Sequence, residues 1–146
     1  MSDLRDIYQE VILEHAKAPR NFRELVDPHR KAEGSNPLCG DRCSVSVAMD
    51  AAVIKDIAFQ GSGCAISRAS ASMMTQALKG KTKEEAERLF HDFQEMVTGG
   101  NGHSDMGKLQ VFAGISGFPT RVKCATLAWH TMHAALRGGR EPVSTE

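Results

Sequence analysis

The sequence predicts an α+β fold: a small antiparallel β-sheet of about three strands, with helices packed on one face. Two observations favour this fold class. Residues 44–50 and 53–60 alternate between polar and apolar side chains, as strands with one buried face do. The later segments instead carry apolar residues at helical spacing, and strands followed by a run of helices are typical of α+β domains. We expect residues 1–146 to form a single domain.

The first predicted element is an amphipathic helix near the N-terminus. Apolar side chains recur every three or four positions over residues 4–15, Ser2 or Asp3 is a suitable N-cap, and Pro19 ends the pattern. Residues 20–38 contain prolines, glycine and asparagine, and they predict a loop. The two alternating runs that follow predict an antiparallel hairpin.

The second half of the chain is predicted to be helical. They span residues 66–78, 82–96, 109–115 and 125–136. Thr82 and Glu85 form a capping-box pattern at the start of the second of these helices. Phe118–Pro119 predicts a break before the last helix. We expect the tail to be disordered from about residue 139, where two glycines begin a polar segment.

Composition excludes several classes of protein. The 18 basic and 18 acidic side chains balance, which argues against a nucleic-acid binder that neutralises phosphates. No stretch is long and apolar enough for a membrane helix, and the polar start lacks the pattern of a signal peptide. We therefore expect a cytoplasmic protein with reduced thiols. Its 4 cysteines then predict metal ligands or nucleophiles rather than disulfides.

Four residues are candidate metal ligands: Cys39, Asp41, Cys64 and Cys124. Thiolates with a carboxylate suit Zn²⁺ or an iron–sulfur cluster, and the carboxylate indicates a coordination position that can open. Glycines next to Cys39 and before Cys64 allow the backbone to bend around an ion. Cys64 and Cys124 each precede a predicted helix, whose N-terminus would favour the thiolate.

Four segments carry a specific resemblance to a known family. They are residues 4–21, 36–42, 61–74 and 121–129. Residues 36–42 read Asn-Pro-Leu-Cys-Gly-Asp-Arg, and the segments around Cys64 and Cys124 match the other two cysteine motifs of the same family. The chain resembles the iron–sulfur cluster assembly proteins of the IscU/NifU type over nearly its whole length. The resemblance implies an IscU-like fold.

Two details are similar to the SufU branch of that family. Lys123 stands where IscU scaffolds carry a histidine, and extra residues lie within 80–118. The resemblance implies a Zn²⁺ site made by the four candidate ligands. It also implies that Cys39 accepts persulfide sulfur from a SufS-type cysteine desulfurase, a pyridoxal-phosphate enzyme, for the iron–sulfur assembly machinery. Arg121 corresponds to a functional arginine of the family, so Cys39 and Arg121 are the candidate catalytic residues.

Two other functions remain open at this point. The same four ligands could hold iron or a [2Fe–2S] cluster, so the alternative function is a scaffold that assembles a cluster and transfers it to apo-proteins. The third possibility is a structural zinc module that stimulates the desulfurase by docking to it. Metal content and the effect of replacing Cys39 distinguish these functions.

Several other residues have simpler interpretations. We expect Cys43 to be a buried strand residue, with a Cys39–Cys43 disulfide as the alternative. His15, His130 and His133 are expected to be ordinary core or surface histidines rather than metal ligands.

Overall fold

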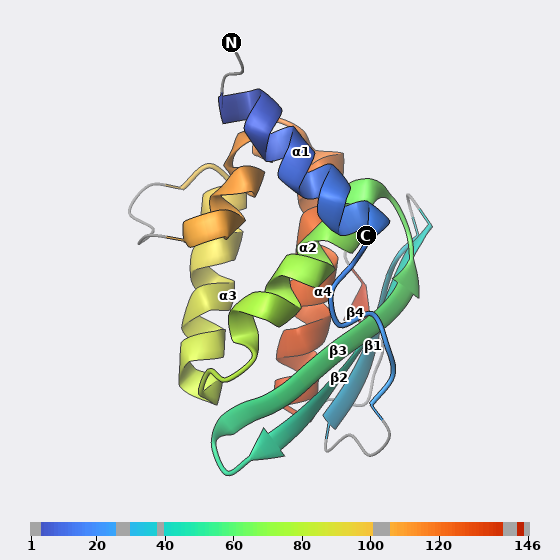
Figure 1. Cartoon of the computed structure of the whole chain (residues 1–146), viewed down its shortest axis with the longest axis vertical. Helices are drawn as coiled ribbons and strands as arrows, with labels where there is room; N and C mark the ends of the chain where they lie inside the picture. The colour runs from blue at the N-terminus through green and yellow to red at the C-terminus, as the bar shows by residue number, and fades with distance from the viewer. Residues whose placement is uncertain (1–3, 26–29, 38–39, 101–105, 139–142, 145–146) are drawn as a thin grey trace.

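The computed structural model of the chain (Figure 1) describes residues 4–25, 30–37, 40–100, 106–138 and 143–144. The elements in chain order are α1 (Leu4–Lys17), β1 (Arg30–Asn36), β2 (Asp41–Asp50), β3 (Val53–Ser62), α2 (Ala65–Leu78), α3 (Lys83–Val97), the 3₁₀ helix η1 (Gly107–Ile115), α4 (Pro119–Leu136) and β4 (Val143–Ser144).

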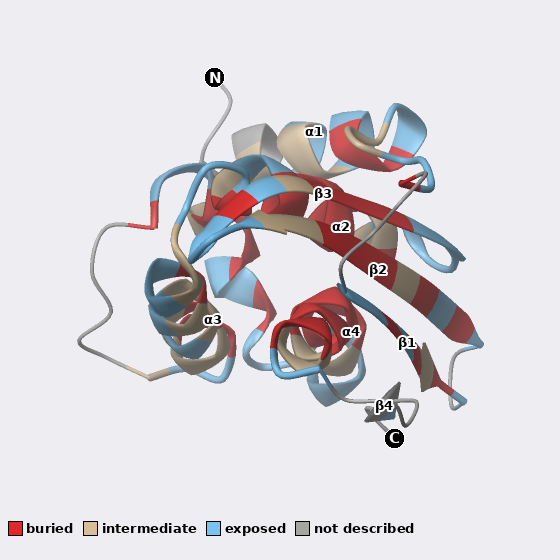
Figure 2. Cartoon of the chain, turned by 90° about the horizontal axis from the view of Figure 1, so that it is seen from below, coloured by how far each residue is buried: buried red, intermediate tan, exposed pale blue. Residues whose placement is uncertain are grey.

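The strands form one sheet in the order β3-β2-β1-β4. β2 pairs antiparallel with both β1 and β3, whereas β4 pairs parallel with β1. Figure 2 shows the curved sheet arching over α4, with α3 on the same side of it. The predicted α+β class and the β2–β3 hairpin are confirmed.

The prediction of a loop over residues 20–38 is wrong for β1 (Arg30–Asn36). This strand has no large apolar residue, so its sequence lacks the usual pattern. Its inward positions are nevertheless buried, and a side chain at Gly34 would overlap the Thr131 hydroxyl of α4. The glycine therefore marks a close contact between strand and helix, not a turn.

The last long helix begins earlier than predicted. Pro119 is the first residue of α4, a position where a missing N–H costs nothing, so it starts the helix instead of interrupting the chain before it. Cys124 consequently lies in the second turn of α4 and not before the helix. A helix N-terminus therefore favours the thiolate of Cys64 but not that of Cys124.

The other predicted helices are confirmed. Thr82 and Glu85 form both hydrogen bonds of the capping box of α3. The candidate caps Ser2 and Asp3 lie outside the described residues, as does most of the tail predicted to be disordered. Within that tail, Val143–Ser144 pair with β1, so the prediction is wrong for these two residues.

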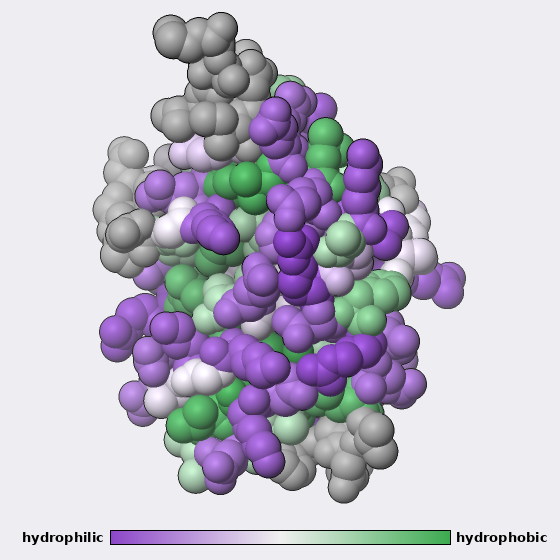
Figure 3. All heavy atoms as spheres, viewed as in Figure 1, coloured by the Kyte–Doolittle hydropathy of each residue, from purple (hydrophilic) through white to green (hydrophobic). Residues whose placement is uncertain are grey.

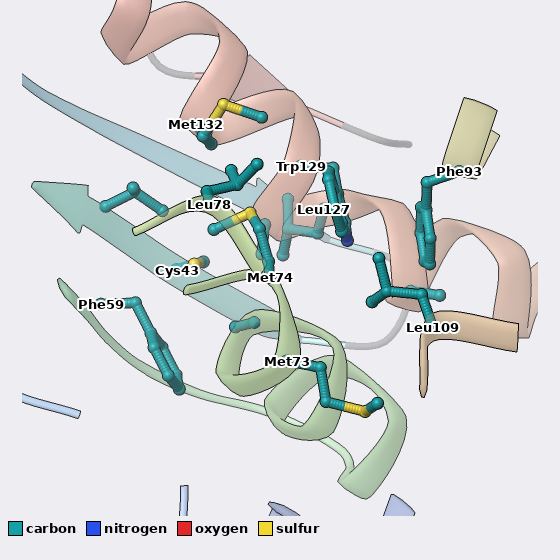
Figure 4. Packing of buried hydrophobic residues seen from close by; sticks show 14 of the residues in the cluster. Cys43, Phe59, Met73, Met74, Leu78, Phe93, Leu109, Leu127, Trp129 and Met132 are labelled. Carbon is teal, nitrogen blue, oxygen red and sulfur yellow. The ribbon is translucent and has the colours of Figure 1, made fainter. Parts of the chain in front are cut away.

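A buried network joins α2 to α4 beneath the sheet. The Trp129 indole donates to Ser70 Oγ at 3.1 Å, and that hydroxyl donates to the Ala125 carbonyl oxygen at 2.5 Å. Phe93 of α3 stacks on Trp129 with ring centroids 4.5 Å apart, as Figure 4 shows among the surrounding core residues. These contacts fix the relative positions of two helices that carry candidate ligands.

The molecular surface is mostly polar on the face seen in Figure 3, where hydrophobic residues form small separate patches. Four large hydrophobic side chains are exposed in the described part of the chain: Leu13, Phe22, Val53 and Phe118. Among the described helices, none combines the length and the apolar character needed to cross a membrane.

Candidate metal centre

Three of the four predicted ligands converge at one end of the sheet. A carboxylate oxygen of Asp41 and the sulfur atoms of Cys64 and Cys124 all lie within 4.8 Å of one another. Asp41 is the first residue of β2, Cys64 is the N-cap of α2, and Cys124 belongs to α4. Asp41 and Cys124 are buried, whereas Cys64 is exposed to solvent. The cluster therefore has one accessible side.

Strand register brings Asp41 to Cys64. Arg42 pairs with Ser62, so the start of β2 lies beside the end of β3, from which the chain continues directly to Cys64. Gly63 allows the backbone before Cys64 to pass close to the Asp41 carboxylate, because a Cβ atom at Gly63 would lie 2.5 Å from Asp41 Oδ1. A glycine is required at this position by contact rather than by its backbone angles.

Hydrogen bonds hold the Asp41 and Cys64 side chains in place. The backbone N–H of Cys64 donates to Asp41 Oδ1 at 2.9 Å, and Cys64 Sγ lies 3.7 Å from Asp41 Oδ2. The Ser67 N–H donates to Cys64 Sγ at 3.4 Å. Ser67 was not among the residues predicted from the sequence. It is the third residue after the N-cap Cys64, the position whose N–H usually bonds to an N-cap side chain. Both ligands thus receive N–H groups from the start of α2, where negative charge is favoured.

The donor set fits a zinc ion. Zinc bonds of about 2.3 Å to sulfur and about 2.0 Å to oxygen put tetrahedral donors roughly 3.5–3.8 Å apart. The 3.7 Å between Cys64 Sγ and Asp41 Oδ2 matches this spacing, and the remaining separations need only a small contraction. A tetrahedral site requires a fourth donor. The predicted fourth ligand, Cys39, lies outside the described residues.

The turn between β1 and β2 contains Cys39 in its sequence. Asn36 pairs with Asp41 at the ends of the two strands, and the Gly40 N–H donates to the Asn36 carbonyl oxygen at 2.9 Å. Gly40 has φ of +75°, a conformation that favours glycine. Pro37 and Gly40 are both exposed, so these two residues lie at the surface.

Cationic residues are close to the candidate ligands in the sequence. Arg42 follows Asp41 in β2, Lys123 precedes Cys124, and Arg121 lies one helical turn before Cys124. The Arg121 guanidinium lies over the exposed ring of Phe118, 4.6 Å from its centroid. This arrangement leaves the predicted functional arginine at the surface, beside an exposed aromatic ring.

Cys43 is a buried strand residue, as expected. It is 6% exposed within the hydrophobic core, it carries a free thiol, and burial raises its pKa to about 12. The core environment makes this thiol a poor nucleophile.

The histidines have structural contacts. His15 Nδ1 lies 2.7 Å from Ser72 Oγ, and His133 stacks on Phe90. Among the residues that the structure describes, no histidine belongs to the Asp41, Cys64 and Cys124 cluster.

Comparison with known proteins identifies the family. The family described as NifU-like N terminal domain matches residues 7–125. An iron-sulfur cluster assembly scaffold protein IscU from Streptococcus pyogenes is 42% identical, over 94% of this chain and 87% of that protein. A zinc-dependent sulfurtransferase SufU from Bacillus subtilis is 40% identical, over 92% of both chains.

A solved structure agrees with these relatives. The crystal structure of FiSufU from Fervidobacterium islandicum superposes with a TM-score of 0.84 at 33% identity, covering 92% of this chain and 99% of that one. With its matching fold and motifs, the chain belongs to the NifU-like N-terminal domain family of iron–sulfur cluster assembly proteins, together with relatives named IscU and SufU.

Proposed function

We propose that this chain is a zinc-dependent sulfurtransferase of the cytoplasm. In this proposal it accepts persulfide sulfur from a SufS-type, pyridoxal-phosphate-dependent cysteine desulfurase and passes it to the iron–sulfur assembly machinery. The observation that carries the proposal is the convergence of Asp41, Cys64 and Cys124 donor atoms within 4.8 Å. The similarity to the Bacillus subtilis protein named as a zinc-dependent sulfurtransferase supports it.

Cys39 is the proposed fourth ligand. Covalent geometry keeps the Cα atoms of residues 39 and 41 within about 7 Å of each other, so the Cys39 thiol belongs to the neighbourhood of Asp41. When bound, zinc supplies redox-inert stabilisation of thiolates at neutral pH. The zinc, three thiolates and one carboxylate carry a formal charge of −2, which Arg121 and Lys123, on the same helix as Cys124, offset.

The proposed chemistry is a sulfur transfer between thiols. The Cys39 thiolate attacks the outer sulfur of a persulfide on the desulfurase. A new S–S bond forms to Cys39, the S–S bond of the donor persulfide breaks, and the donor cysteine leaves as a thiolate. No net oxidation occurs. Exposed Pro37 and Gly40 on either side of Cys39 in the sequence suit a residue that must meet a partner's active site.

A cluster scaffold is the second candidate, because the similar Streptococcus pyogenes relative is named as one. Lys123 favours transfer, since the resembled scaffolds carry a histidine there. Elemental analysis and a visible spectrum of the purified protein separate the two functions. Colourless protein with stoichiometric zinc supports transfer, whereas brown protein with iron and sulfide supports the scaffold and contradicts our proposal.

Sulfur acceptance by Cys39 is tested with the desulfurase. We expect Cys39→Ala to abolish the stimulation of desulfurase turnover, whereas Cys43→Ala, a matched control four residues away, keeps it. A Cys39→Ala protein that stays folded, retains zinc and stimulates turnover fully would show that the chain acts by docking, as a structural zinc module.

A further inference from the structure

A hollow of about 660 Å³ lies on the sheet near the candidate metal centre. Its lining takes residues from three strands, including Glu33 of β1, Ser44 of β2 and Gln60 of β3, and it also includes Asp41 and Cys43. The first three positions alternate with the buried core residues of the same strands, so they belong to the face turned away from the helices. The Glu33, Ser44 and Gln60 side chains therefore face away from the hydrophobic core.

The register of the strands orders the polar side chains in two rows. Ser35, Arg42 and Ser62 form the row nearer the β1–β2 turn, and Glu33, Ser44 and Gln60 form the next row. Arg42 and Glu33 are diagonal neighbours across β1 and β2, which places their backbones roughly 7–8 Å apart. A cation and an anion thus border the hollow on one face of the sheet.

These two charges have no ionic partner in the described part of the chain. Lys31, one position further along this face of β1, pairs with Glu24 at 3.3 Å, but neither Arg42 nor Glu33 forms an ion pair there, with each other or with a third residue. Both side chains are exposed. A guanidinium binds a carboxylate in a two-pronged geometry, and a carboxylate accepts hydrogen bonds from an ammonium group.

We propose that the hollow binds a small zwitterionic α-amino thiol of the class of free cysteine. Arg42 holds the ligand's carboxylate, Glu33 holds its ammonium group, and the Ser35, Ser44 and Gln60 side chains supply further hydrogen bonds. The volume falls in the range typical of small-molecule sites, about 300–1,000 Å³, and admits the ligand with its hydration water. Pro37 and Gly40 also line the hollow, so the ligand lies beside the turn whose sequence contains Cys39.

The role of this ligand rests on the proposed function. If Cys39 carries a persulfide, the ligand's thiolate attacks the outer sulfur. The bond between that sulfur and Cys39 breaks, the ligand leaves as a persulfide with the outer sulfur and its proton, and Cys39 returns as a thiolate. The site thereby releases sulfur to a small carrier. Binding itself requires no sulfur transfer and is testable separately.

The binding test uses the full chain with its metal and follows backbone amide NMR signals during titration. L-serine, which lacks a thiol, is the first probe, because cysteine could bind the metal instead of the hollow. We expect L-serine and L-cysteine to shift the amides of Ser35, Ser44 and Gln60 saturably. Cysteamine and 3-mercaptopropionate, which each lack one of the two charges, should bind at least about tenfold more weakly, since each loses a charged hydrogen bond.

Variants complete the test. Arg42→Gln and Glu33→Gln should each weaken L-serine binding by about tenfold or more, while Arg88→Gln and Glu10→Gln, exposed matched controls on α3 and α1, stay within about twofold. Failure of L-serine to shift these amides overturns the proposal. So does cysteine binding that survives both hollow variants and disappears on metal removal. Loss of desulfurase binding in both variants without amino-acid binding would assign the hollow to a protein partner. None of these results bears on metal content, which tests the proposed function.

Discussion

Gly63→Ala tests how the fold builds the candidate metal centre. An added Cβ would lie 2.5 Å from Asp41 Oδ1, 3.0 Å from Asp41 Cγ and 3.2 Å from Ser67 Oγ. The carboxylate must move, because an approach below 3.0 Å is not tolerated. Its movement also breaks the 2.9 Å hydrogen bond that Oδ1 accepts from the Cys64 N–H. The substitution thus displaces one proposed ligand without touching a ligand residue.

The expected size of the effect follows from that bond. A hydrogen bond to a charged group contributes about 1.5–3 kcal/mol, so the metal-free protein should lose stability in about this range. Residues that orient a metal ligand typically change metal affinity by about 10–100-fold when they are replaced. We expect zinc affinity to fall within that range. The core should persist, because Gly63 is exposed and outside the hydrophobic cluster.

Chelator competition measures the zinc affinity, and thermal unfolding of the metal-free protein measures the stability. Gly117→Ala is the matched control, since an added Cβ there meets nothing within 4 Å and its backbone has no positive φ. We expect it to leave both quantities unchanged. Equal zinc affinity in the Gly63→Ala, Gly117→Ala and unmodified proteins would refute the placement of Asp41 as a ligand held by this contact.

Three further predictions concern other parts of the fold. Cys43→Ala should retain zinc and desulfurase stimulation but lose about 1 kcal/mol of stability in chemical denaturation, because Cys43 only fills the core. Loss of sulfur transfer in this variant would instead indicate a redox role for Cys43. Gly34→Ala should cost about 1–3 kcal/mol in the same assay, since the added Cβ overlaps Thr131, and an unchanged midpoint would contradict that packing. Burial, and secondarily Arg20, lowers the pKa of His15, so the unfolded chain takes up a proton more readily as the pH falls below about 6.5, the ordinary pKa of histidine. Stability should therefore fall below that pH, and His15→Asn should reduce the fall; an identical pH profile would exclude His15 as its source.

Periodicity and capping patterns were sufficient where local sequence decides the structure. The alternating β2–β3 hairpin, the capping box of α3 and the helix that follows Cys64 all appear where they were predicted. In each case the side chains that form the element also carry its signal. The convergence of Asp41, Cys64 and Cys124 was also expected from the sequence, where glycines adjoin Asp41 and Cys64.

Tertiary contacts determine the elements that were predicted wrongly from the sequence. β1 is a strand because β2 pairs with it and α4 covers Gly34, and neither contact has a local signature. A proline can either break a helix or occupy its first position. Residues 120–136 continue as a helix, so Pro119 is the first residue of α4. The hollow beside Arg42 depends on the β1–β2 register, which cannot be deduced without knowing that β1 exists.

Under the proposed function, Cys39 reacts while Asp41, Cys64 and Cys124 stay in place, and each of these three donors has its own anchor in the fold. Cys124 is held in α4, which the core packs against α2 through Trp129 and Ser70. Cys64 is held as an N-cap, and Asp41 by its strand and by the Cys64 N–H. All these contacts are made by the protein itself, so each of the three donors has an anchor besides the metal. If Cys39 is the fourth ligand, as proposed, these anchors would let it leave the metal and attack a persulfide while Asp41, Cys64 and Cys124 keep their places.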